Sequence, residues 1–134
     1  MTKLIPITTA LFLLFSSIVA SFAVEAELSP DEAQAVASVQ AYMGALITGD
    51  VARMRAHLAP GLLAERKALL DNPTYPQHLQ NAYGDASFEV VDQLWVGSDK
   101  VRVDVKIQLN PQDIVHIRFV LIQIDNSYLI NAEE

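Results

Sequence analysis

The sequence predicts an α+β domain in which three N-terminal helices pack on a curved, four-stranded antiparallel sheet. Three observations support this prediction. Apolar residues recur at helical spacing from Val36 to Leu70. From Ser87 onward their spacing changes to two, which is the period of a strand with one buried face. Short turn sequences separate four such stretches, so we expect a meander of strands whose inner face the helices cover.

The first 23 residues have the pattern of a secretory signal peptide. Lys3 gives a short positive start, residues 4–19 are uncharged and apolar, and Ser21 and Ala23 occupy the −3 and −1 positions of a cleavage site. We therefore expect a single domain at residues 24–134, periplasmic or secreted, with no membrane association after cleavage. The alternative is an uncleaved anchor in an envelope assembly, because residues 4–24 are long enough to span a bilayer.

The composition excludes several classes of function. The chain has 16 acidic and 9 basic residues, a net charge of −7, and therefore no electrostatic footprint for nucleic acid or for anionic membranes. It has no cysteine, which excludes disulfides, thiolate metal sites and thiol nucleophiles. The three histidines, His57, His78 and His116, are scattered without metal-ligand spacing, so we expect neither a metal nor a cofactor.

The first helix begins at Ser29, where Ser29-Pro30-Asp31-Glu32 has the residues of a capping box with proline at the first helical position. Its apolar stripe comprises Val36, Val39, Met43, Leu46 and Ile47. Gly49 is expected to end it, because glycine readily adopts the left-handed conformation that follows many helices.

Asp50 is expected to cap the second helix, which Pro60-Gly61 interrupts. A third helical segment is predicted over residues 62–70, and Asp71-Asn72-Pro73 stops it. Residues 77–83 fit either a short helix or a lid-like loop.

The four predicted strands begin near Ser87, Val101, Ile114 and Tyr128. Pairing Val103 with Phe119 brings the apolar side chains of the second and third strands onto one face and sets Asp104 opposite Arg118 on the other. A tight turn at Ser98-Asp99 pairs Leu94 with Val103. In that register Asp92 points inward and Trp95 points outward.

The join Val39-Gln40-Ala41-Tyr42 to Gly49-Asp50 resembles the opening of the nuclear transport factor 2-like superfamily, which includes ketosteroid isomerases and polyketide cyclases. The resemblance implies a cone-shaped α+β fold and places Tyr42 where those isomerases have their oxyanion-hole tyrosine. Their aspartate base would fall near Glu65-Arg66-Lys67, where this chain has no aspartate. The chain therefore looks closer to the small secreted members of the superfamily, most of which have no assigned activity, than to the isomerases.

These elements predict a pocket inside the cone and an interface outside it. The pocket residues are Tyr42, Met43, Phe88, Val90, Asp92, Val105 and Phe119. An apolar patch of Trp95, Val120, Ile122 and Ile124 lies outside, covered either by a second copy or by the chain's own N-terminal segment.

Three functions follow as hypotheses. The first is a non-catalytic binding or accessory domain that takes a small apolar ligand in its cone or a protein on its sheet. The second is an isomerase or cyclase in which Asp92 and Tyr42 move protons. The third is the anchored envelope component, which depends on residues 4–24.

Overall fold

The structure, a computed structural model, describes residues 28–134. The predicted signal peptide and its alternative, the membrane anchor, lie outside the described residues. Within the described part of the chain, no helix is both long and apolar enough to cross a membrane.

The first described helix, α2 (Pro30–Thr48), begins and ends at the predicted residues. The Ser29 hydroxyl accepts a hydrogen bond from the Glu32 amide at 3.2 Å and donates one to the Glu32 carboxylate at 2.9 Å. Gly49 ends the helix with a φ of 75°. Asp50 then caps α3 (Val51–Ala56) by accepting a hydrogen bond from the Arg53 amide at 3.2 Å. The sequence therefore turns from one helix into the next within two residues.

The helical half differs in detail from the three predicted helices. The segment predicted over residues 62–70 is two short helices, α4 (Pro60–Glu65) and α5 (Lys67–Leu70), because Arg66 has φ −97° and ψ 7° and interrupts the helical path. The stretch that fitted either a helix or a loop is helix α6 (Tyr75–Tyr83). Five helices therefore precede the sheet in residues 28–134.

The four strands form one antiparallel sheet in the order β1-β2-β3-β4. They are β1 (Ser87–Trp95), β2 (Lys100–Asn110), β3 (Asp113–Ile124) and β4 (Ser127–Glu133). The predicted register of β2 and β3 is confirmed: Val103 pairs with Phe119, and Asp104 pairs with Arg118. The connection of β3 to β4 uses Asp125 and Asn126, both with positive φ, as a two-residue hairpin turn requires.

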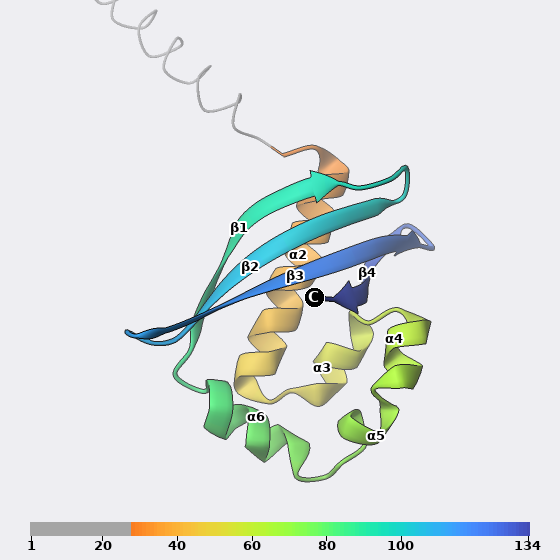
Figure 1. The fold of residues 1–134 in the computed structure, drawn as a ribbon. Coiled ribbons are helices and arrows are strands. Elements are labelled where there is room, and N and C mark those ends of the chain that lie inside the picture. Colours follow the sequence, from red (N-terminus) through yellow and green to blue (C-terminus); the bar gives the residue numbers. More distant parts are fainter. Residues whose placement is uncertain (1–27) are drawn as a thin grey trace, which may run out of the picture.

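Helix α2 crosses one face of the sheet, and α3 to α6 gather at one end of it (Figure 1). We call the face against α2 the inner face and the opposite one the outer face. The core lies between α2 and the inner face, where alternate residues of β2, from Val101 to Ile107, are buried. The β4 edge is also closed, because the Ala59 amide donates to the Ile130 carbonyl at 2.8 Å. The fold therefore leaves the outer face and the β1 edge uncovered by residues 28–134.

Candidate functional site

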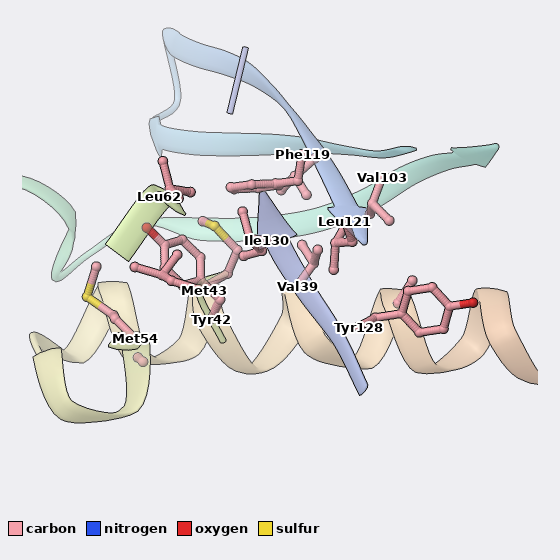
Figure 2. Close-up of a cluster of buried hydrophobic side chains, with 14 of the residues drawn as sticks. Val39, Tyr42, Met43, Met54, Leu62, Val103, Phe119, Leu121, Tyr128 and Ile130 are labelled. Atoms are coloured by element: carbon pink, nitrogen blue, oxygen red, sulfur yellow. The ribbon is translucent and has the colours of Figure 1, made fainter. Parts of the chain in front are cut away.

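The inner face is filled by side chains from α2 and the sheet. Tyr42 and Met43 point from α2 toward Phe119 and Ile130 (Figure 2). Met43, Phe119 and Val105 are fully buried, and Tyr42 is 2% exposed. These side chains come from three separate elements and occupy the space that the sequence predicted as a pocket. Two further predicted pocket residues, Phe88 and Val90 of β1, are half-buried at the margin of this cluster.

Tyr42 links the apolar core to a polar cluster at its rim. Its ring packs edge-on against Phe119, with the centroids 5.7 Å apart. Its hydroxyl accepts a hydrogen bond from Nη1 of Arg66 at 3.3 Å. Nη2 of Arg66 lies 2.8 Å from the Glu133 carboxylate. The three residues come from α2, the α4–α5 junction and β4, and we call them the Tyr42 cluster.

The electrostatics of the Tyr42 cluster favour the neutral form of Tyr42 and the charged form of Arg66. Burial, and then the negative charge of Glu133, raise the pKa of Tyr42 well above its usual range and outweigh the opposing effect of Arg66. Burial lowers the pKa of Arg66, but the hydrogen bond and charge of Glu133, together with Tyr42 and Tyr75, outweigh it, so that pKa is raised. The cluster therefore holds a neutral phenol, a guanidinium and a carboxylate that is already paired.

Arg66 and Glu133 were not singled out from the sequence. Arg66 lies in the segment where the resemblance implied an aspartate base, and the structure places a cation there instead. The sequence feature that could have identified Arg66 is the charged stretch Glu65-Arg66-Lys67 after the second helix. Glu133 had no such signal, because its side chain reaches Arg66 only after a bulge in β4, between the pairs Val120–Ala132 and Leu121–Ile130.

The prediction that Asp92 points into the cone is wrong. Asp92 pairs with Asp104, whose side chain lies on the outer face, and the Asp92 side chain is 59% exposed. The turn between β1 and β2 is one residue longer than predicted, because Val96 rather than Gly97 bonds to Lys100. Gln93 rather than Leu94 therefore lies opposite Val103. A one-residue shift moves a side chain to the other face of a sheet. Asp92 and Tyr42 therefore do not share a cavity.

The prediction that Trp95 lies on the outer face is also wrong, because the same one-residue shift moves it. It pairs with Val101 and lies on the inner face, where it packs edge-on against Tyr128 with centroids 6.5 Å apart. The other three predicted interface residues, Val120, Ile122 and Ile124, are partly buried members of the outer face, as the confirmed register of β2 and β3 requires.

The outer face combines apolar residues with paired charges. Arg118 lies 3.1 Å from Asp104, Lys106 lies 3.2 Å from Glu89, and Arg102 lies 3.8 Å from Asp92. A shallow depression of about 340 Å³ crosses this face and is lined by Val91, Asp104, His116, Ile117, Arg118 and Glu134. Apolar side chains flank the charges: Leu94 and Ile114 are each 48% exposed. The described residues contain no group of His, Cys, Asp or Glu side chains that could hold a metal ion.

Comparisons with known proteins agree on the fold. No protein-family model matches the chain, and no curated protein sequence matches it. A solved structure of an NTF2-like protein of unknown function from Shewanella baltica OS155 matches 80% of this chain and 94% of its own, with a TM-score of 0.56 and 10% identity. A ketosteroid isomerase-like protein from Erwinia carotovora atroseptica SCRI1043 matches 79% and 95%, with a TM-score of 0.53 and 12% identity. The chain therefore has the nuclear transport factor 2-like fold.

Proposed function

We propose that this protein is a non-catalytic interaction domain that associates through the outer face of its sheet with a second copy of itself. One observation carries the proposal. Helices and core side chains close the inner face, whereas residues 28–134 leave apolar side chains on the outer face uncovered. An apolar sheet face that no other element covers is a candidate interface.

The distribution of charge favours a second copy as the partner. Each chain carries a net charge of −7, so two copies repel at most orientations. The outer face is balanced instead. Its basic residues are Lys100, Arg102, Lys106 and Arg118, and its acidic residues are Glu89, Asp92, Asp104 and Glu134. Two outer faces can therefore approach each other with less electrostatic repulsion than other parts of the negatively charged surface. Opposite charges can also pair across such an interface.

The state of the Tyr42 cluster supports a non-catalytic role. A general base must be free to accept a proton from a substrate. The carboxylate of this cluster, Glu133, is bound to Arg66, and Asp92 lies on the other face of the sheet. The isomerase or cyclase reading therefore loses the acid–base pair on which it depended.

Two leucines of nearly equal exposure provide the test. Leu94 lies on the outer face and is 48% exposed, whereas Leu69 lies on α5 and is 46% exposed. Sedimentation equilibrium of the wild-type chain is expected to show a dimer. Leu94→Glu should weaken association at least about tenfold, because it places a charge at a desolvated contact. Leu69→Glu should leave it unchanged.

A monomeric wild-type chain at all concentrations would contradict the proposal. Equal effects of the two leucine substitutions would also contradict it, because association would then not depend on the outer face.

A further inference from the structure

The β1 strand forms one edge of the sheet, and its far side has no strand partner within residues 28–134. The opposite edge, β4, is closed by the segment around Leu58. Val91, Leu94, Trp95 and the following Val96 are all among the exposed large apolar side chains. An edge strand with this composition is a template on which another chain can add a strand.

The backbone of β1 has an identifiable outward side. The Val96 amide donates to the Lys100 carbonyl of β2 at 3.1 Å. Antiparallel pairs alternate between bonded and non-bonded positions, so Leu94 and Asp92 also direct their main-chain groups toward β2. Gln93 and Trp95 therefore direct theirs away from the sheet, where an added strand would bind.

The Asp92 side chain is hydrogen-bonded to one of these outward main-chain groups. The Gln93 amide donates to Oδ1 of Asp92 at 2.9 Å, so an incoming strand would have to displace Asp92 to accept its hydrogen. The register also shifts between Val90 and Asp92, which leaves Val91 without a partner in β2. Such bulges bend a strand and protect an edge, and a charged side chain there adds to the protection.

We propose that Asp92 keeps the β1 edge closed to strand addition by a second copy of this chain. Two β1 edges would pair antiparallel through the outward groups of Gln93 and Trp95. In that arrangement the Gln93 amide of each copy would have to donate to the other copy, but in the folded chain it donates to Asp92. The proposal concerns the edge and not the outer face, so it stands whether or not the face-to-face dimer forms.

The test compares Asp92→Ala with Asp92→Asn in the full chain by sedimentation velocity. Asp92→Ala removes the acceptor, and species larger than those of the wild type are expected. Asp92→Asn removes the charge and the ion pair with Arg102 but keeps an acceptor oxygen for the Gln93 amide, so it should sediment like the wild type. Glu89→Gln is the charge control and should also match the wild type.

A double variant identifies the edge as the surface that associates. Gln93→Pro removes the outward amide without affecting a ladder bond, because proline is tolerated at such edge positions. Asp92→Ala combined with Gln93→Pro should return to the wild-type size. Circular dichroism should show that the helices of the native fold persist in the larger species.

Four results would overturn the proposal. Asp92→Ala could sediment like the wild type, Asp92→Asn could assemble as Asp92→Ala does, or the larger species could persist with Gln93→Pro. Larger species that have lost the native helical signal would also contradict it, because they would report unfolding rather than edge pairing.

Discussion

Asp92 lies directly opposite Asp104 in the register of β1 and β2, on the outer face of the sheet. Two carboxylates in register would repel each other. Arg102 lies 3.8 Å from Asp92 and 3.5 Å from Asp104, and Arg118 lies 3.1 Å from Asp104. The two guanidinium groups offset that repulsion and give the outer face its balanced charge. Asp92, the candidate acid or base of the isomerase hypothesis, is thus part of a surface charge network.

Gly49→Ala is expected to destabilise the protein by at least about 1–3 kcal/mol. Gly49 has a φ of 75°, and a Cβ atom there would lie 2.6 Å from the Pro76 carbonyl oxygen of α6. Gly44→Ala, within α2, is the matched control. A Cβ atom at Gly44 would meet nothing within 4 Å, so this substitution should stabilise by about 0.5–1 kcal/mol. Urea unfolding measures both values, and the same sign for the two variants would refute this account of the turn.

Asp50→Ala should destabilise by about 1 kcal/mol, because the Arg53 amide loses its capping acceptor. Asp50→Asn should cost much less, since asparagine is an equally good N-cap residue. The free energy of unfolding of the two variants separates the capping hydrogen bond from the charge. Equal losses would show that the charge of Asp50 matters instead.

Tyr42→Phe should make the protein more resistant to alkaline unfolding. The pKa of Tyr42 in the folded protein is raised above the value of about 10 expected in the unfolded chain. Its contribution to stability is therefore complete below about pH 10 and is lost as the pH rises toward the folded pKa. The free energy of unfolding of the wild type should fall above that pH, and the free energy of unfolding of Tyr42→Phe should fall less steeply.

Tyr75→Phe provides the comparison for that experiment. Burial also raises the pKa of Tyr75, but this side chain is only partly buried. Tyr75→Phe removes this hydroxyl and should therefore reduce the loss of stability at alkaline pH less than Tyr42→Phe does. Should the wild type and Tyr42→Phe lose stability in parallel, the desolvation of Tyr42 would be refuted.

Arg66→Met should cost more stability than Glu133→Gln. Arg66 and Glu133 are each 27% exposed, so solvent screens their ion pair and its loss alone should cost at most about 1 kcal/mol. Removing Arg66 also leaves the buried Tyr42 hydroxyl without its hydrogen-bond donor, which adds about 1–3 kcal/mol. Chemical unfolding of both variants gives the order, and a reversed order would contradict the role assigned to Arg66.

The sequence predicted the α+β class, the join at Gly49 and Asp50, and the register of β2 against β3. These features depend on local signals: a capping residue, a glycine, and two strands in which apolar and polar residues alternate. The opposite charges of Asp104 and Arg118 added a second, independent indication of that register.

The faces of Asp92 and Trp95 could not be predicted, because they depend on the length of one turn and on a bulge. The turn moves Gln93 opposite Val103, and the shift after Val90 then returns Val90 and Phe88 to the inner face. Nothing in the composition of β1 distinguishes this arrangement from an unbulged strand. The contact of Arg66 with Glu133 joins residues 67 positions apart, so it depends on the complete fold.

The most direct test of the proposed interface uses the absence of cysteine from the chain. Leu94→Cys and Leu69→Cys each introduce a single thiol at positions of nearly equal exposure. The rate of thiol labelling is measured as the protein concentration is raised. Protection of Leu94→Cys that increases with concentration, with no change for Leu69→Cys, is the predicted result. Labelling of Leu94→Cys that does not depend on concentration would contradict the proposal that two copies bury this face.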